Sequence, residues 1–244
     1  MAFLEVHHLV KRFGGITAVD DCSFAVEQGS ITSLIGPNGA GKTTAFNLIS
    51  GVIRPDSGRV LFSGHDITRL KPNRITRLGI SRTFQITRDL AEMSVLENLV
   101  VQSLVRRVGD LFRSAVDKEE SERALSLLDF MGIAHLAMLK AKNLSYGQKK
   151  LMELAAVMMS EPKLVLLDEP AGGVNPTLLE AIIDRIFELN RQGITFLIVE
   201  HNMDMVMKVC NPVICMAYGT VLAIGAPDEI QHNQEVLEAY LGVV

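Results

Sequence analysis

The sequence has little of what marks disulfide-rich, metal-binding or membrane-spanning proteins. Only three cysteines occur in 244 residues, Cys22, Cys210 and Cys215, and none belongs to a CxxC pair. We therefore expect reduced structural thiols, as in a cytosolic protein. No apolar run reaches the roughly 18–20 residues that cross a bilayer, and the N-terminus lacks the apolar stretch of a signal peptide. If the protein works at a membrane, another component must hold it there.

An excess of positive charge is also absent. Lys and Arg number 24 against 28 Asp and Glu, which gives a net charge of −4. Because general nucleic-acid-binding proteins are usually basic, the composition argues against nucleic acid as a partner, although a local basic face can hide within a balanced total. Hydrophobic residues make up 48 % of the chain, which excludes extensive disorder and predicts a substantial core.

What is present indicates an α/β fold. Residues 3–15 and 20–30 are typical of short strands in an antiparallel sheet. The buried-strand run "ITSLI", a glycine-rich loop and the helical "AFNLIS" then follow in the order that starts a parallel α/β sheet. "KLVLLDEP" and "ITFLIVEH" are near-continuous apolar runs, as expected of strands covered on both faces.

Between these parts, residues 72–138 have a helical composition. In "DKEESERALSLLDFMGI", Asp117 and Glu120 form a capping-box pattern, and Gly132 is placed to end the helix. Its apolar residues fall on one face, which is typical of a helix packed on a core.

The glycine-rich loop "GPNGAGKT" fits G-x-x-x-x-G-K-[ST]. Its glycines let successive N–H groups point inward as an anion-binding nest, and the helix that follows adds its positive N-terminal end. Lys42 brings a full charge to the β- and γ-phosphates, Thr43 offers a hydroxyl to Mg²⁺, and Thr44 is a further donor. A chance glycine turn is the alternative, which the strand–loop–helix context disfavours. The predicted nucleoside triphosphate site consists of Gly36, Pro37, Asn38, Gly39, Ala40, Gly41, Lys42, Thr43 and Thr44.

Two carboxylates and a histidine end the later strands. Asp168 and Glu169 close one apolar run and His201 closes the next, at the edge where parallel sheets present their ligand groups. We expect Asp168 to hold Mg²⁺ beside Thr43, and Glu169 to orient or deprotonate the attacking water. The alternatives are a solvated acid pair and an ordinary structural histidine.

These motifs, with "TFQ" (Gln85), "LSYGQ", "GGVNP" and "VEH", make the chain resemble the ATP-binding cassette (ABC) ATPases over nearly its whole length. The resemblance implies a P-loop NTPase cassette that uses ATP and Mg²⁺, with a mostly parallel core sheet, an antiparallel β subdomain and a helical subdomain. The chain would be one domain of residues 1–244, with the helical subdomain inserted at about 86–160.

The resemblance also gives the remaining residues their roles. Two cassettes would sandwich ATP head to tail, so Ser145, Gly147 and Gln148 would bind the nucleotide of the other chain, at a helix N-terminus suited to anions. His201 would contact the γ-phosphate. Gln85 would join Mg²⁺ and the attacking water to the membrane partner. Phe13 would stack on adenine with Val19 beside it, although a core aromatic is the alternative for Phe13.

Two positions depart from the usual family pattern. Tyr146 replaces a glycine, and Asn175 replaces an aspartate, which puts charge-dependent coupling between the two sites in doubt. "ISRTFQ", "LSYGQ", "GGVNP", "VEHNMDMVM" and "VLEAYLG" are together similar to the ATPase subunits of branched-chain amino acid importers. That similarity implies a peripheral protein on the cytoplasmic face of the inner (plasma) membrane.

Its partners would be a second cassette, identical or paralogous, and transmembrane permease subunits, with a periplasmic or extracellular solute-binding protein acting indirectly. Related cassettes that import urea or other small solutes, or export lipopolysaccharide, remain alternatives. A soluble non-transport ABC ATPase, which would commonly have two cassettes or a long coiled coil, and a small-molecule kinase, which leaves "LSYGQ" unexplained, fit less well.

Overall fold

The computed structural model describes residues 2–83, 90–103 and 118–241. The N-terminal part forms a four-stranded sheet in the order β2-β1-β4-β5. Its strands are β1 (Ala2–Phe13), β2 (Ile16–Glu27), β4 (Ser57–Phe62) and β5 (His65–Asp66), and every pair is antiparallel. The predicted antiparallel sheet is confirmed.

A six-stranded sheet in the order β10-β9-β3-β8-β7-β6 forms the centre of the protein. Its strands are β3 (Ile31–Ile35), β6 (Ile80–Arg82), β7 (Leu164–Asp168), β8 (Thr195–Val199), β9 (Val213–Ala217) and β10 (Thr220–Gly225). All neighbours pair in parallel except β9 and β10, which are antiparallel. The mostly parallel core sheet is therefore confirmed.

The edge strand β6 was missed by the sequence prediction, which made the whole stretch 72–138 helical. Only three residues form it, and they follow helix α2 (Pro72–Leu78) directly after Gly79. Three residues are too few to show the alternation or the long apolar run by which a strand is recognised. Strand β6 ends at Arg82 and is followed by Thr83, and both of these residues contact Asp168.

The central sheet has a different partner on each face. Leu34, Leu166 and Leu197 belong to one core cluster, together with the antiparallel sheet and α1 (Lys42–Ile49). Ile35, Leu167 and Ile198 belong to the other, which is completed by helices. Because adjacent residues of a strand point to opposite faces, these neighbouring residues divide between the two cores.

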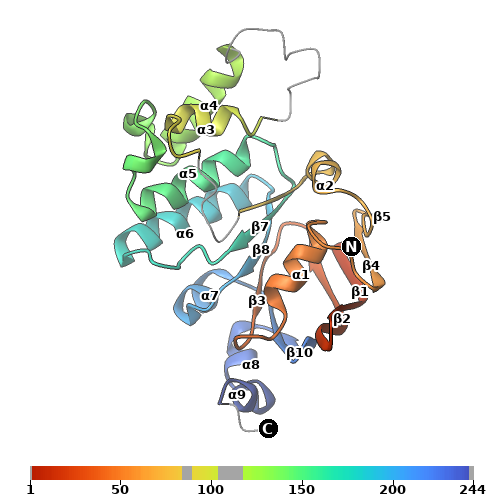
Figure 1. The fold of residues 1–244 in the computed structure, drawn as a ribbon. Helices are drawn as coiled ribbons and strands as arrows, with labels where there is room; N and C mark the ends of the chain where they lie inside the picture. Colours follow the sequence, from red (N-terminus) through yellow and green to blue (C-terminus); the bar gives the residue numbers. More distant parts are fainter. Residues whose placement is uncertain (1, 84–89, 104–117, 242–244) are drawn as a thin grey trace.

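The helices of the second core are shown in Figure 1, with α3, α4, α5 and α6 grouped beside the sheet. Gly132, at φ 74°, follows α4 and ends it as predicted, whereas Asp117 lies outside the described residues. The 86–160 subdomain boundary stays a prediction. The helices after α2 are α3 (Val95–Val100), α4 (Lys118–Phe130), α5 (Tyr146–Met158), α6 (Pro176–Arg191), α7 (Met203–Val209), α8 (Pro227–Gln231) and α9 (Gln234–Leu241), and two 3₁₀ turns span Ala134–Leu136 and Ala141–Asn143.

Within the described ranges, none of the helices has the length and apolar character needed to cross a bilayer. All three cysteines are free and buried, as expected.

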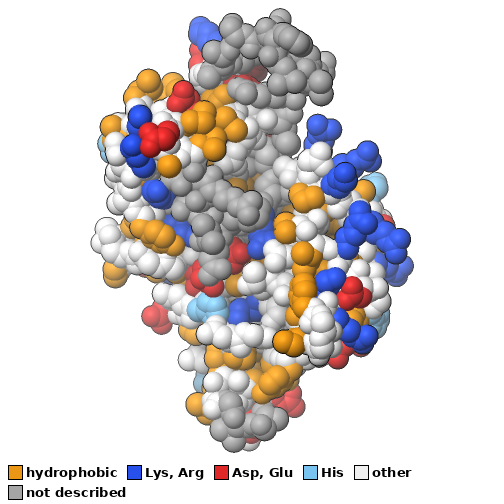
Figure 2. All heavy atoms as spheres, in the orientation of Figure 1, with side chains coloured by type: hydrophobic (Ala, Val, Ile, Leu, Met, Phe, Trp, Pro, Cys, Tyr) orange, Lys and Arg blue, Asp and Glu red, His pale blue; other side chains and the backbone are white. Residues whose placement is uncertain are grey.

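Charge is unevenly spread over the surface. Figure 2 shows Lys and Arg side chains gathered over α2 and the neighbouring antiparallel sheet. The exposed basic residues of this region are Arg54, Arg59, Arg69, Lys71, Arg74 and Arg77. The balanced total charge thus includes a local basic face.

Candidate functional site

The site lies at the carboxyl ends of β3, β7 and β8, three neighbouring parallel strands. Gly36 follows β3 and Gly41 precedes α1, with φ angles of 147° and 98°. A Cβ atom on Gly36 would lie 2.0 Å from the Met216 carbonyl oxygen, and one on Gly41 would lie 2.4 Å from the Ala18 carbonyl oxygen. These two glycines are therefore required both by the backbone conformation and by the close approach of neighbouring backbone.

Lys42, the first residue of α1, is buried inside this loop. Its Nζ donates to the Gly36 carbonyl oxygen at 2.7 Å and to the Pro37 carbonyl oxygen at 2.9 Å. Burial lowers the pKa of Lys42, and the negative charge of Glu169 opposes that shift. The loop thus holds a partly desolvated ammonium group that a phosphate would stabilise.

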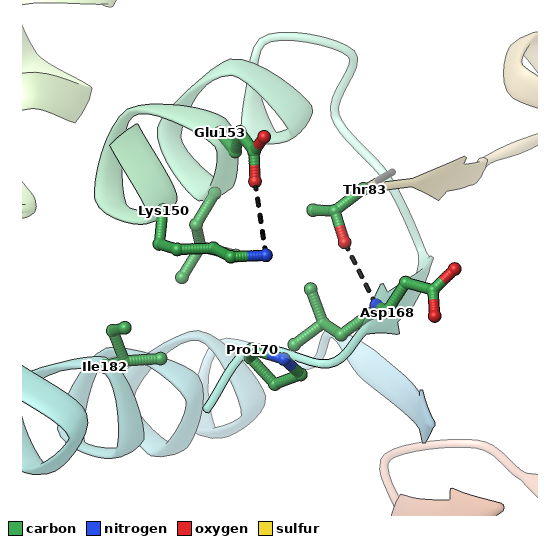
Figure 3. A pocket seen from close by; sticks show the side chains of 8 residues that line it. Thr83, Lys150, Glu153, Asp168, Pro170 and Ile182 are labelled. Carbon is green, nitrogen blue, oxygen red and sulfur yellow. Dashed lines mark hydrogen bonds and ion pairs between the residues drawn. The ribbon is translucent and has the colours of Figure 1, made fainter. Parts of the chain in front are cut away.

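Asp168, the last residue of β7, is held from two sides. Its Oδ2 accepts from Arg82 Nη2 at 2.9 Å, and its backbone N–H donates to Thr83 Oγ1 at 3.1 Å, the contact drawn in Figure 3. Its other oxygen, Oδ1, is buried and has no hydrogen-bond partner in the described part of the chain. A buried carboxylate oxygen without a donor is a position for a cation or a bound water.

The Oδ1 atom of Asp168, which has no partner among the residues that the structure describes, shows whether this site suits Mg²⁺. Mg²⁺ takes oxygen ligands and is commonly bound through one or two carboxylates plus the phosphates of the substrate. Thr43, the other predicted oxygen ligand, is exposed at the start of α1. No cluster of three His, Cys, Asp or Glu suited to a metal occurs among the described residues. The Asp168 carboxylate and the Thr43 hydroxyl are oxygen donors of the kind that Mg²⁺ takes.

Arg82 is a functional residue that sequence reasoning missed. Its Nη1 donates to Asn47 Oδ1 at 2.7 Å and to Ser50 Oγ at 3.1 Å, while Nη2 bonds Asp168. The guanidinium also lies over the Phe46 ring, 5.4 Å from its centre. Arg82 therefore joins the end of α1 to the Asp168 carboxylate. The motif "ISRTFQ" contained it, but nothing in the motif indicates a buried charge.

Glu169 and His201 lie at the same edge of the sheet, as predicted, and their side chains are close together. His201 Nε2 lies 3.1 Å from Glu169 Oε1, and both side chains are partly exposed. Glu169 has a φ of 49°, and its N–H donates to the Val199 carbonyl oxygen at 2.9 Å. A non-glycine residue in this conformation stores strain, which proteins retain mainly at functional sites.

Glu200 is the second residue that the sequence did not reveal. Although it adjoins His201, it is almost fully buried, with 2 % of its surface exposed. Its carboxylate accepts backbone N–H groups from Ala171 at 2.6 Å, from His201 at 2.7 Å and from Asn202 at 2.9 Å.

The "LSYGQ" segment forms the N-terminus of α5. Ser145 caps the helix by accepting from the Gln148 N–H at 3.3 Å, and the Gln148 side chain accepts from the Ser145 N–H at 2.9 Å. Ser145 is exposed, so its hydroxyl and the helix end are open to a ligand. Gly147 is instead buried, and a Cβ there would lie 1.9 Å from Leu178 Cδ2 of α6. An alanine at this position would require the Leu178 side chain to shift.

The two residues that depart from the family pattern, Tyr146 and Asn175, both make local contacts. The Tyr146 ring lies against Gly173, whose added Cβ would be 3.0 Å from Tyr146 Cε1. Asn175 caps α6 by accepting from the Leu178 N–H at 2.9 Å. Asparagine and aspartate cap helices about equally well, so this local role does not need the missing charge.

The two residues predicted to contact adenine differ in their exposure to solvent. Phe13 ends β1 with 49 % of its surface exposed and with Lys11 Nζ 5.5 Å from its ring centre, so it is free to stack on a base. Val19 is fully buried in the core under the antiparallel sheet. Its side chain cannot reach a ligand from there, and packing accounts for it. Gln85 lies outside the described residues.

A small cavity lies behind Asp168, between the central sheet and α5. It has a volume of about 20 Å³ and is lined by Thr83, Lys150, Glu153, Asp168 and Pro170, among others. Lys150 Nζ and Glu153 Oε2 are 3.9 Å apart at its border. The space would hold at most one water molecule, so it is no substrate site.

Comparisons with known proteins agree with this geometry. A family model described as "ABC transporter" matches residues 19–172, and one described as "Branched-chain amino acid ATP-binding cassette transporter" matches residues 220–244. The probable branched-chain amino acid transport ATP-binding protein LivG of Archaeoglobus fulgidus is 44 % identical, over 99 % of this chain and 96 % of its own length. The high-affinity LivG protein of Escherichia coli is 38 % identical, over 98 % and 97 %.

Solved structures show the same relationship. A nucleotide-free ATP-binding cassette from an ABC transporter matches with a TM-score of 0.90 at 38 % identity, covering 98 % of this chain and 99 % of that one. The ADP conformation of an ATP-binding cassette of an ABC transporter gives 0.89 at 38 % identity, with 99 % of each chain covered.

Proposed function

Because the chain belongs to the ABC transporter family and is an ATP-binding, ATP-hydrolysing subunit, we propose that it powers the uptake of branched-chain amino acids through ATP-driven pairing of two cassettes. The names of its relatives support the transported solute. The pairing is supported by the exposed, capped N-terminus of α5 at Ser145, because helix N-termini favour anions. The phosphate loop belongs to another element of the same chain.

In the proposed site, the loop of one chain and Ser145 of another hold opposite sides of one triphosphate. The loop N–H groups and Lys42 bind the phosphates, and Phe13 stacks on the base. Asp168 Oδ1 and Thr43 would hold Mg²⁺, which supplies charge neutralisation at the β- and γ-phosphates. Glu169 orients or deprotonates the attacking water, and His201, whose Nε2 lies 3.1 Å from Glu169 Oε1, contacts the γ-phosphate. Loss of the γ-phosphate removes a group that bridges the two chains, so the pair loosens.

Two kinds of partner follow from this proposal. The first is a second cassette, identical or paralogous. The second is a pair of permease subunits that hold the protein at the cytoplasmic face of the membrane, with a solute-binding protein acting on those subunits from the other side. Nucleic acid is not among the proposed partners.

Pairing is tested with Ser145→Arg and Glu169→Gln. In the first variant a large cation replaces the cap at the helix end, so each monomer should bind ATP normally but no ATP-driven dimer should form in size-exclusion chromatography. Glu169→Gln keeps the binding groups and removes the acid, so it should form a lasting dimer with ATP and hydrolyse it at least 100-fold more slowly, since acid–base groups contribute about 10²–10⁴-fold. A stable ATP-dependent dimer of Ser145→Arg would contradict the proposal, as would near-normal hydrolysis by Glu169→Gln.

The solute is tested by reconstitution with the permease subunits in vesicles. ATP should drive uptake of radiolabelled leucine, and the Glu169→Gln protein serves as the matched inactive control. ATP-dependent uptake of urea without leucine would replace the solute and leave the ATPase assignment intact.

A further inference from the structure

We propose that Glu200 is a positioning residue for the ATPase reaction: its buried carboxylate fixes the loop that follows Glu169 against the loop that carries His201. The proposal rests on the roles proposed above for Glu169 and His201. Among the described residues, both oxygens of Glu200 accept backbone N–H groups, and the side chain is almost fully buried. Its effect must pass through the two residues it places.

The contacts divide between the two oxygens of the carboxylate. Oε1 accepts from the Ala171 N–H at 2.6 Å, in the loop after β7. Oε2 accepts from the N–H groups of His201 and Asn202 at 2.7 and 2.9 Å, in the loop after β8. One charged group thus satisfies backbone donors of both loops and holds them at a fixed separation.

The loop after β7 is short and tightly turned, so what holds Ala171 also holds Glu169. The Gly172 N–H donates to the Glu169 carbonyl oxygen at 3.1 Å, and the Glu169 N–H donates to the Val199 carbonyl oxygen at 2.9 Å. Glu169 is therefore held on its N-terminal side by β8 and on its C-terminal side through Ala171. The strained φ of 49° at Glu169 persists only when the surroundings fix it in this way.

A neutral amide cannot replace this carboxylate. Glutamine has one acceptor oxygen and one NH₂ group, so on one side two donors would face each other. A charged acceptor also forms stronger hydrogen bonds than a neutral acceptor. Because this site is buried, a backbone N–H that loses its acceptor is costly. Glu200→Gln should therefore release one loop, whichever way the amide is turned.

The test is a double-mutant cycle with steady-state ATPase kinetics. Glu200→Gln should lower kcat by about 10- to 100-fold, the effect of displacing reacting groups by a fraction of an ångström to one ångström, while the KM for ATP changes less than about 3-fold, since binding belongs to the phosphate loop. In a His201→Ala background the same change should cost less than about 3-fold, because the pair that Glu200 aligns is already broken.

Two controls separate positioning from loss of folding. Glu229→Gln makes the same chemical change at a carboxylate that accepts the Ala226 N–H at 2.9 Å, at the start of α8, and should leave kcat unchanged. Ile75→Val removes a methylene from a buried site on α2 and shows what a modest loss of thermal stability does to kcat. Melting temperatures of all variants are measured alongside.

A normal kcat for folded Glu200→Gln would overturn the proposal, as would an equal fractional loss of kcat with and without His201. Full activity of both Glu169→Gln and His201→Ala would instead refute the proposed catalytic pair itself, which keeps the two failures distinguishable.

Discussion

At the scale of single residues, the phosphate loop was predictable because its chemistry is local in sequence. Gly36, Gly41 and Lys42 lie within seven positions, and each type is required by conformation or charge. Arg82 and Glu200 were not predictable. Arg82 pairs with a carboxylate 86 positions away, and a single sequence gives no sign of which buried charges meet.

Lys42→Ala should weaken ATP binding about 10- to 100-fold, because the variant loses a charged donor to the phosphates and such bonds contribute roughly 1.5–3 kcal/mol. Isothermal titration of the monomer measures it directly. Lys71→Ala, at an exposed lysine before α2, is the matched control and should bind normally. Affinity within twofold of the parent protein in Lys42→Ala would contradict the assigned role of the loop.

Arg82→Met should destabilise the fold by roughly 3–5 kcal/mol, because it leaves the buried Asp168 carboxylate without its cation. Urea denaturation, monitored by circular dichroism in the absence of nucleotide and Mg²⁺, measures this loss in the free energy of unfolding independently of ATPase activity. Arg77→Met removes an exposed arginine of α2 and should cost less than about 0.5 kcal/mol. An Arg82→Met loss as small as that of Arg77→Met would show that the ion pair does not hold Asp168.

At the scale of elements, strands and helices were predicted well where their patterns are long. The apolar runs of β7 and β8 and the helix that Gly132 ends all appear where expected, and β6 was missed because it is three residues long. The role of Gly147 was also incompletely predicted, because its contact with α6 depends on tertiary packing.

Gly147→Ala should destabilise the contact between α5 and α6, since its Cβ would lie 1.9 Å from Leu178 Cδ2. Because the Leu178 side chain can move, the cost should lie at the low end of the about 1–3 kcal/mol of overpacking, and the ~0.5–1 kcal/mol that alanine gains over glycine within a helix should offset part of it. The same change in a Leu178→Ala background should be neutral or stabilising, because the obstructing methyl is gone. Equal costs in both backgrounds, measured by urea denaturation, would contradict this packing.

At the scale of the whole molecule, the α/β class and the two sheets followed from the order of motifs. The strand order β10-β9-β3-β8-β7-β6 did not. It is this order that places the ends of β3, β7 and β8 side by side, and with them the phosphate loop, Asp168 with Glu169, and His201.

The core should also protect all three thiols. Burial raises the pKa of Cys22 and Cys210 to about 12 and that of Cys215 to about 11. Because the thiolate is the reactive form, the folded protein at pH 8 should gain no mass from iodoacetamide under conditions in which the urea-unfolded protein gains three adducts. Labelling of the folded protein as fast as the unfolded one would contradict the buried placement.

In the proposed mechanism each chain carries one half of each of two ATP sites, so a single copy should hydrolyse ATP poorly. The most direct measurement is ATP turnover per chain over a wide range of protein concentration, with Mg²⁺ and saturating ATP, alongside sedimentation to measure pairing. Turnover per chain should fall in proportion to concentration once pairing is lost on dilution. Full turnover per chain by strictly monomeric protein would show that one chain holds a complete site and that pairing is not required.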